Sequence, residues 1–437
     1  MGKKKSSIAL DALLKLPDEV VAYNIDGELL VVSPQDGNWL VISETQFEIL
    51  EQLRSGRTVG EVISTASDRR ICLSLVKQII ARDFTEKELS VASRNTKVFF
   101  YLTYECNLQC EHCYMYAQRR KAPLLSVHEY DAIFEELKRK GVEETTFSGG
   151  EPLMRPDFWS IINSARRKGL FPKVFSNGTL WSDADIEKAK DFSIKVQISI
   201  DGVDEKSCAT VRGANVFEKA KEVAVKLAKA GVDVEISTTP IWSNMETVER
   251  GYSTFVKEMR EAAGREIKCR VSLDLLPGRH MSNPSEAEKK EYENRCRRLY
   301  SIANLRTPQI PFFDAYRKGQ GRIACGIGRL VFTPDGFVHV CSRLDSFPPI
   351  GNVRDIGIQH LMEEARKCML AVSVDNTIPC RECALRYICG GGCRADCYEH
   401  MSTSMEKPSM RKPCSEEHKA LLLRMMVRAT RVCYAWE

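Results

Sequence analysis

A sixfold alternation of strand-like and helix-like segments between residues 97 and 276 constrains the fold of this 437-residue chain more than any other feature. The strand-like segments are 98–104, 144–148, 171–176, 194–200, 232–238 and 269–275. The helix-like segments between them are 128–140, 157–168, 183–190, 215–230 and 249–262. Such a series predicts an α/β fold with a parallel sheet, either open and doubly wound or a partial barrel. In both cases the active site lies at the carboxyl ends of the strands.

Three cysteines follow the first of these strands, in the run Cys106-Asn-Leu-Gln-Cys110-Glu-His-Cys113. Three thiolates can bind three irons of a [4Fe–4S] cubane and leave the fourth iron open to a small molecule. Zinc is the alternative, because His112 is adjacent. Zinc sites usually pair two CxxC units across a gap, however, and His112 cannot easily share a metal with both Cys110 and Cys113.

Glycines and polar residues follow the later strands. Gly149-Gly150-Glu151-Pro152 comes directly after the second strand. Glycine lets the backbone approach a ligand closely, and a glutamate offers an acceptor to a ligand ammonium, although a Gly-Gly pair is also common in ordinary turns. The polar residues at later strand ends that fit the same pocket are Ser176, Asn177, Ser199, Asp201 and Ser237.

Cysteines gather again near the C-terminus. The chain has 17 of them, which for a long chain with clustered cysteines indicates metal binding in a reducing compartment rather than a disulfide framework. The candidate ligands there are Cys325, Cys341, Cys380, Cys383, Cys389, Cys393 and Cys414. The segment is short of apolar residues, so we expect metal clusters to hold it together, with structural zinc as the alternative.

The CxxxCxxC motif with Tyr114 after it, and the GGEP motif at the next strand, resemble the cluster and methionine motifs of the radical S-adenosylmethionine (SAM) superfamily. The resemblance implies a partial (β/α)6 TIM-type barrel. It also implies that the open iron binds SAM and that reduction of the cluster releases a 5′-deoxyadenosyl radical, which removes a hydrogen atom from the substrate. The implied SAM contacts are Tyr114, Gly149, Gly150, Glu151, Pro152, Ser176, Asn177, Ser199, Asp201 and Arg212.

The C-terminal spacings resemble the SPASM extension of this superfamily, which houses two auxiliary [4Fe–4S] clusters and would bring the total to three. The resemblance assigns Cys325, Cys341 and Cys393 to the first auxiliary cluster. It assigns Cys380, Cys383, Cys389 and Cys414 to the second. The first then either takes Cys397 as a fourth ligand or keeps an open site for a substrate thiolate.

Residues 17–92 predict a small α+β domain. Apolar runs on either side of the Asp26-Gly27 turn indicate a hairpin, a third strand fits 37–42, and helical patterns follow Ser43. Three strands followed by three helices is a winged-helix-like plan, and it resembles the PqqD-like domains that bind leader peptides. The resemblance implies strand addition of a leader at an edge strand around residues 29–42.

These regions predict a flexible N-terminus (1–16), a recognition domain (17–92), a radical SAM core (93–276), a connector (277–320) and a SPASM domain (321–437). The combination resembles peptide maturases, and the run 389–395 is similar to that of thioether-forming enzymes. We therefore expect an oxidoreductase that joins a cysteine sulfur to a carbon within a ribosomally made precursor peptide. The alternatives are carbon–carbon crosslinking, formylglycine formation, and a non-catalytic iron–sulfur or zinc scaffold that binds peptide.

Charge and hydrophobic composition indicate which classes of partner the protein has. The formal net charge of +5 is mild and gives no signature of nucleic-acid binding. No apolar run approaches the roughly 20 residues that span a bilayer, so we expect a cytoplasmic protein without membrane contact. A ferredoxin or flavodoxin would supply electrons. The sequence leaves a general base open among Asp274, Glu235 and His280.

Overall fold

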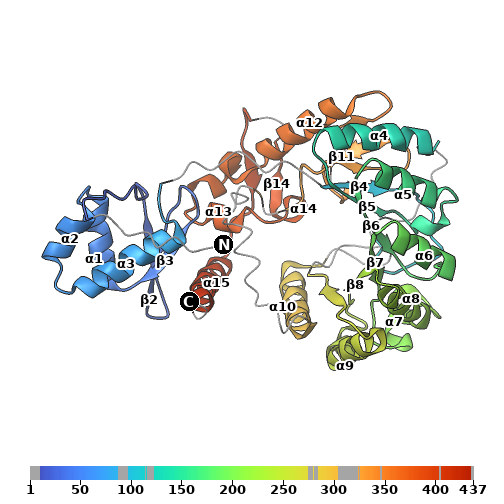
Figure 1. Cartoon of the computed structure of the whole chain (residues 1–437), viewed down its shortest axis with the longest axis horizontal. Coiled ribbons are helices and arrows are strands. Elements are labelled where there is room, and N and C mark those ends of the chain that lie inside the picture. The colour runs from blue at the N-terminus through green and yellow to red at the C-terminus, as the bar shows by residue number, and fades with distance from the viewer. Residues whose placement is uncertain are drawn as a thin grey trace. The chain divides into compact units, whose positions relative to one another are not determined.

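The computed structural model describes residues 10–86, 97–113, 115, 123–273, 279, 284–303, 323, 325–344, 347–402 and 405–434. Its chain forms two compact units, and Figure 1 labels their elements. One unit comprises residues 94–309 and 326–366, and the other comprises 1–93, 310–325 and 367–437. Tyr114, Asp274 and His280 lie outside the described residues.

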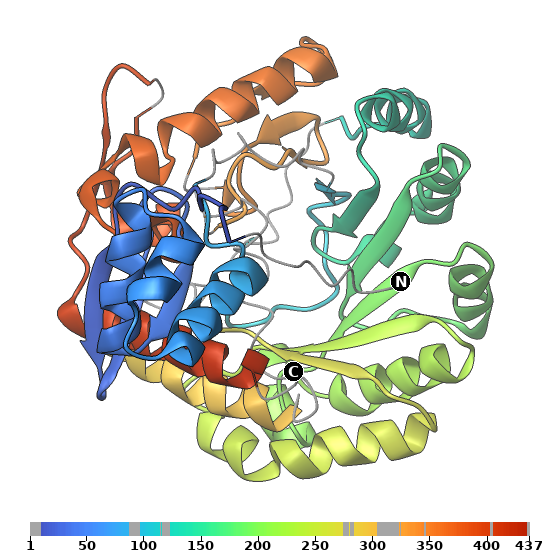
Figure 2. The same ribbon diagram turned by 60° about the vertical axis from the view of Figure 1, so that its left-hand side comes forward.

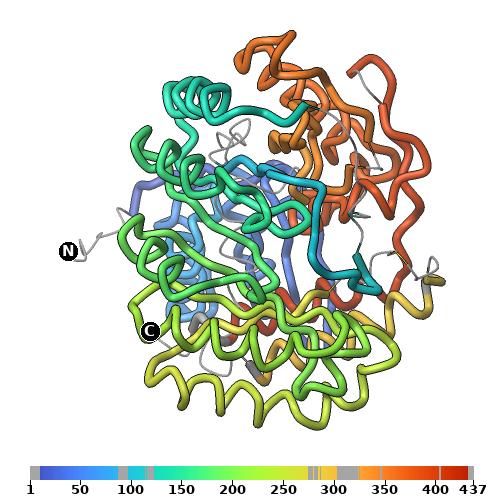
Figure 3. Tube along the Cα trace, turned by 90° about the vertical axis from the view of Figure 1, so that its right-hand side faces the viewer, coloured from blue at the N-terminus to red at the C-terminus, as the bar shows by residue number. Residues whose placement is uncertain are grey.

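The first of these units is built on a nine-stranded sheet with the order β12-β11-β10-β4-β5-β6-β7-β8-β9. Its six consecutive parallel strands are β4 (Lys97–Tyr101), β5 (Glu144–Ser148), β6 (Phe171–Ser176), β7 (Lys195–Ser199), β8 (Asp233–Thr238) and β9 (Lys268–Val271). The main helices are α4 (Val127–Arg139), α5 (Phe158–Arg167), α6 (Asp183–Asp191), α7 (Glu205–Arg212), α8 (Phe217–Lys229), α9 (Met245–Ala263) and α10 (Glu286–Ala303). Helices α4 to α9 line the outside of the sheet (Figure 2), and Figure 3 shows them following one another along the unit. The predicted partial α/β barrel is confirmed.

Local chemistry explains these elements. Ser126 and Glu129 form a reciprocal capping box at the start of α4, which satisfies backbone donors that a helix leaves open. The strands alternate in burial, as β6 does, so one face meets the helices and the other faces the barrel interior. Phe100 stacks between Phe147 and Phe332, with ring centroids 5.5 and 4.7 Å away. This aromatic stack forms part of the hydrophobic core around β4.

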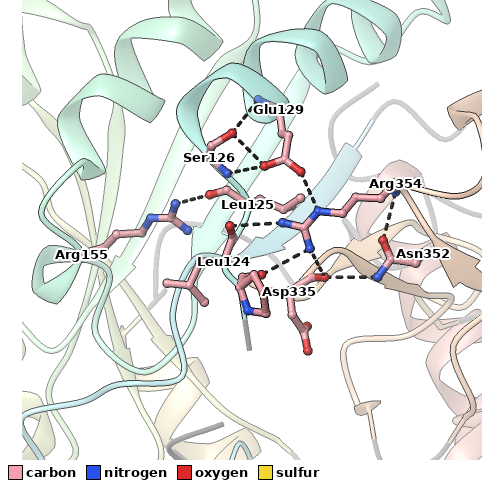
Figure 4. A network of polar contacts seen from close by, with 9 residues as sticks. Leu124, Leu125, Ser126, Glu129, Arg155, Asp335, Asn352 and Arg354 are labelled. Carbon is pink, nitrogen blue, oxygen red and sulfur yellow. Dashed lines mark hydrogen bonds and ion pairs between the residues drawn. The ribbon is translucent and has the colours of Figure 1, made fainter. Parts of the chain in front are cut away.

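Three short strands extend the barrel sheet beyond β4, which the sequence did not predict. They are β10 (Val331–Phe332), β11 (Phe337–His339) and β12 (Gly351–Asn352), and β10 pairs in parallel with β4. Arg354 holds these three strands against the segment before α4 (Figure 4). Its Nε lies 2.6 Å from a Glu129 carboxylate oxygen, and its other guanidinium nitrogens donate to the carbonyls of Leu124 and Asp335. The segment that leads into α4 is therefore clamped to the turn between β10 and β11.

The other unit contains the predicted three strands and three helices. These are β1 (Val21–Ile25), β2 (Glu28–Val32), β3 (Trp39–Ile42), α1 (Glu44–Arg54), α2 (Val59–Thr65) and α3 (Arg69–Arg82). The sheet order is β1-β2-β3, so β2 is paired on both sides. The expectation of an edge across 29–42 is therefore wrong for residues 29–32, and within that range the edge strand is β3.

Both faces of this small sheet are covered. Helices α1 to α3 pack on the face that carries Val31 and Leu40. On the opposite face, Leu30, Val32 and Trp39 pack with helix α15 (Glu416–Tyr434), and Trp39 Nε1 donates to Thr430 Oγ1 at 3.0 Å. No local pattern indicates this contact, because it joins segments almost 400 positions apart.

The cysteine-rich segment of the same unit has short elements. They are the 3-10 turns Val374–Asn376 and Cys380–Glu382, β13 (Thr377–Ile378), α13 (Arg386–Cys389), α14 (Arg394–Cys397), β14 (Tyr398–His400) and β15 (Ser409–Arg411), preceded by α12 (Ile358–Ala371). Leu385 and Ile388 join the core formed by Leu30, Trp39 and α15. None of the described helices is long and apolar enough to cross a membrane.

Candidate active site

A cavity of about 280 Å³ opens at the carboxyl ends of the barrel strands, where the sequence placed the active site. Cys106, Cys110 and Cys113 line it. Six of the ten predicted SAM contacts also line it: Gly149, Gly150, Ser176, Asn177, Ser199 and Arg212. Glu151, Pro152 and Asp201 are not among the lining residues, and Tyr114 falls outside the described residues.

The two glycines after β5 hold the backbone that precedes the cysteines. Gly150 N donates to Thr103 O, and Glu151 N donates to Glu105 O, both at 2.8 Å. A Cβ at position 150 would lie 1.9 Å from Glu105 O, and Gly149 has a φ of +139°. Only glycine allows this approach, so the first task of the pair is to seat the cysteine loop.

Glu151 is 1% exposed and binds protein groups rather than the cavity. Its carboxylate accepts from Ser176 Oγ and from Asn177 N, both at 2.8 Å. Burial raises the pKa of Glu151 to about 7, against the effect of those hydrogen bonds. The sequence predicted that Glu151 accepts a hydrogen bond from a ligand ammonium. In the structure both carboxylate oxygens instead accept from residues at the end of β6, which ties the end of β5 to the end of β6. Pro152 begins the 3-10 turn Pro152–Met154 that follows.

Asp201 is fully buried between the side chains of Arg212 and His112. Its Oδ2 lies 2.6 Å from Arg212 Nε and 3.2 Å from His112 Nε2, and its Oδ1 accepts from Thr239 N. Burial would raise the pKa of Asp201, but Arg212 and His112 outweigh it and hold the pKa below its usual value. The carboxylate positions Arg212, whose Nη1 lies 3.8 Å from Cys110 Sγ.

Neighbouring loops secure the cysteine motif from two further sides. Glu111 N donates to Val211 O at 2.9 Å, which ties the motif to α7. Asn107 bonds Asn177 and Thr179 at 2.9 and 2.8 Å, which ties it to the loop after β6. The sequence did not predict α7 as a separate helix because it has only eight residues.

Two buried polar atoms at the cavity wall have no hydrogen-bond partner within the described ranges. They are His112 Nδ1 and Gln197 Oε1. Both residues line the cavity. Sequence reasoning missed Gln197, although its place two residues before Ser199 on β7 puts it on the same face of the strand. Unpaired polar atoms in a cavity wall fit a site that receives a polar ligand.

Glu235, one of the three candidate general bases, is not among the residues that line the cavity. Its carboxylate lies 2.8 Å from Lys173 Nζ, across the strand that separates β6 from β8. This ion pair already engages the Glu235 carboxylate. The other two candidates, Asp274 and His280, lie outside the described residues.

Comparison with known proteins decides the family. The family model of the radical SAM superfamily matches residues 100–249. The mycofactocin maturase MftC of Mycobacterium ulcerans is 36% identical over 311 residues, which cover 67% of this chain and 81% of that protein. This chain belongs to the radical SAM superfamily.

Two further proteins are similar to this chain. The PqqA peptide cyclase of Gluconobacter oxydans is 26% identical over 302 residues, covering 67% of this chain and 84% of that protein. Among solved structures, Streptococcus suis SuiB aligns with a TM-score of 0.55 at 12% identity, over 92% of this chain and 100% of that one. SuiB therefore shares the fold.

As a radical SAM enzyme the chain uses SAM and a [4Fe–4S] cluster, and its barrel site fits them. Three cysteines, an arginine and two unpaired polar atoms face one cavity. No group of three His, Cys, Asp or Glu side chains in the described residues is gathered as a single metal ion requires. Three cysteines that each bind a different iron need no such close grouping. The individual ligand and contact assignments stay predictions.

Six of the seven C-terminal cysteines with predicted ligand roles belong to the unit that contains residues 367–437. Cys341 belongs to the barrel unit, where Tyr101 Oη donates to Ser342 O at 2.9 Å. In the cysteine-rich segment, a hydrogen bond from Cys389 and the charge of Arg411 lower the pKa of Cys414. A lowered thiol pKa favours the thiolate that metals bind. The two auxiliary clusters remain a prediction.

Proposed function

We propose that the chain is a peptide maturase that joins a cysteine sulfur to a carbon within a ribosomally synthesised precursor peptide. One observation carries the proposal: the chain combines the barrel cavity with a separate three-stranded, three-helix unit whose β3 edge suits an added strand. Relatives named as a mycofactocin maturase and a PqqA peptide cyclase support a peptide substrate.

The cluster and SAM together supply a hydrogen-abstracting 5′-deoxyadenosyl radical. The chain's own residues position and shield the reactants. Cys106, Cys110 and Cys113, which line the cavity, would hold the cluster. Arg212, oriented by Asp201, offers its remaining guanidinium nitrogens to the carboxylate of SAM. The lining residues Ser176, Asn177 and Ser199 would contact the rest of that ligand, although the Ser176 hydroxyl already donates to Glu151 and accepts from Gly178 N and Trp181 Nε1.

The C-terminal cysteines serve electron transfer in this proposal. Forming a sulfur–carbon bond removes two hydrogens from the peptide: one leaves as a hydrogen atom, and the other leaves as a proton and an electron. The C-terminal cysteines would hold two auxiliary clusters able to take up that electron, and a ferredoxin or flavodoxin would exchange electrons with the enzyme. All described cysteines are free of disulfides, which is consistent with the reducing cytoplasm that we infer for the protein.

Alkylation of the product tests the bond type. The reconstituted enzyme is incubated anaerobically with SAM, dithionite and a cysteine-containing precursor peptide, and the product is treated with iodoacetamide before mass spectrometry. A thioether product has lost two hydrogens and has fewer alkylatable thiols. A product that has lost two hydrogens but keeps every thiol would replace the thioether with a carbon–carbon crosslink. An unmodified peptide would contradict the maturase itself.

Hydrogen exchange tests the docking edge. A bound leader strand should protect the amides of β3 (Trp39–Ile42), while those of β1 (Val21–Ile25), at the opposite edge of the sheet, should exchange as before. The same leader with its residues scrambled is the control. Protection of β1 alone, or of neither strand, would overturn the β3 site.

A further inference from the structure

Three consecutive glycines separate Cys389 from Cys393. Gly390, Gly391 and Gly392 all adopt left-handed backbone conformations, with φ of +63°, +83° and +71°. This path points their carbonyls at two buried arginines that approach from different elements. Each arginine in turn reaches a cysteine sulfur.

Arg394 is the first of these side chains and is 1% exposed. Its Nη1 donates to Gly390 O and Gly392 O, both at 2.7 Å, and its Nε and Nη2 donate to Val372 O. Nη1 lies 4.0 Å from the sulfur of Cys325, a predicted ligand of the first auxiliary cluster. Backbone carbonyls therefore take most of its donors.

Arg411 is 9% exposed and is directed at the second set of cysteines. Its Nε donates to Gly391 O at 2.9 Å, and its Nη1 lies 2.7 Å from Cys414 Sγ. No carboxylate pairs with it in the part of the chain that the structure describes. A buried cation without a carboxylate is costly unless another anion balances it. A cluster held by four thiolates is such an anion.

We propose that Arg411 raises the reduction potential of the second auxiliary cluster above that of the first. The inference rests on the proposed function through the predicted ligand set of that cluster. Adding one electron to a [4Fe–4S] cluster makes it more negative, so a positive charge and a hydrogen bond at a ligand sulfur favour the reduced form.

The charges around the predicted ligands of the first cluster favour a lower reduction potential for that cluster. Arg394 lies farther from Cys325 Sγ than Arg411 does from Cys414 Sγ. Cys393, predicted to bind the first cluster, has the carboxylate of Asp396 as a hydrogen-bonding neighbour. A nearby negative charge disfavours reduction. The charge arrangement therefore makes the second cluster the better acceptor of a single electron.

A redox titration tests this on the full-length chain without any peptide. Reconstituted protein that carries Cys110→Ala, so that the barrel cluster does not contribute, is titrated with dithionite and followed by electron paramagnetic resonance. Arg411→Gln should lower the higher of the two midpoint potentials by about 59 mV, a tenfold change in a one-electron equilibrium. The lower potential should stay in place.

Two lysine variants keep the test decisive. Arg411→Lys retains the charge but not both hydrogen bonds, so we expect a smaller shift of the same potential, whereas the matched variant Arg394→Lys should leave it unchanged. Equal shifts of both potentials, or none in Arg411→Gln, would overturn the proposal. If Arg411→Gln fails to keep its iron, Arg411→Lys takes its place in the test. An upper midpoint potential that is unchanged in Arg411→Lys would then overturn the proposal. Wild-type protein that binds fewer than two auxiliary clusters would also overturn the proposal. An unmodified peptide in the maturation assay would refute only the proposed peptide maturase activity.

Discussion

The two cysteine-rich regions of this chain are held in different ways. In the barrel, the loop from Cys106 to Cys113 is bonded to the ends of neighbouring strands, and its cation, Arg212, whose side chain is 10% exposed, is balanced by Asp201. Near the C-terminus the regular elements are at most four residues long between Cys380 and Cys414, and Arg411 faces a cysteine instead of a carboxylate. The sheet shapes the first region, whereas we propose that the second depends on the clusters that its cysteines would bind.

The largest effect should come from Gly150→Ala. The new Cβ would meet Glu105 O at 1.9 Å, and since both are backbone-defined positions, the cysteine loop must move. We expect loss of the barrel cluster and of 5′-deoxyadenosine formation, with the auxiliary clusters retained, as measured by iron and sulfide content.

Gly141→Ala is the matched control for this variant. Gly141 also has a positive φ, of +84°, but nothing lies within 4 Å of the position that a Cβ would take there, so the change should cost only about 1 kcal/mol of backbone strain. A Gly150→Ala protein with full iron content would show that the sheet does not shape the barrel loop as described.

Removal of iron should separate the two regions next. Metal binding and folding are coupled where the protein alone supplies little core. After anaerobic chelation, amides of residues 380–397 should exchange far faster, while those of β5 to β8 should keep their protection. Equal loss of protection in both regions would contradict the contrast between them.

Asp201→Asn tests the balanced charge of the barrel. Breaking a buried ion pair leaves Arg212 uncompensated and should lower the free energy of unfolding by about 3 kcal/mol, measured by urea denaturation. The neighbouring Asp204 caps α7 through Ser207 N at 2.7 Å, so Asp204→Asn should cost less than about 1 kcal/mol. Similar losses in the two variants would mean that burial of the pair is not what matters.

The smallest effect concerns the clamp at Arg354. Its hydrogen bond, with help from Ser126, lowers the pKa of Glu129 to about 2. A carboxylate with a lowered folded-state pKa stabilises the fold above its unfolded-state value and loses that contribution as pH falls. Glu129→Gln should therefore cost less than about 1 kcal/mol at pH 7, and the difference should shrink as pH falls from 5 towards 2. A difference that does not change with pH would rule out this ion pair as its source.

The sequence predicted the barrel and the place of its site because both depend on short-range patterns. Strand and helix periodicity located all six parallel strands, although β4 and β9 end earlier than expected. The cysteine loop fell at a strand end, as its position in the sequence required. A pattern of residue types thus located the cavity and six of its predicted lining residues.

Side-chain direction and long-range packing could not be read in the same way. Spacing does not say whether Glu151 or Asp201 faces a ligand or a neighbouring backbone, and both bind protein groups. Strands of two or three residues, such as β10 and β11, carry no periodicity. The packing of α15 on Trp39 joins distant segments, so no local signal reveals it.

The central claim is that the loop from Cys106 to Cys113 lets this chain generate a radical, which we propose acts on a precursor peptide. The most direct test measures 5′-deoxyadenosine and the mass of a precursor peptide after anaerobic incubation with SAM and dithionite. Wild-type protein should form 5′-deoxyadenosine and release a peptide that has lost two hydrogens, and Cys110→Ala should do neither. 5′-Deoxyadenosine formed equally by both proteins, or by neither, would contradict the account.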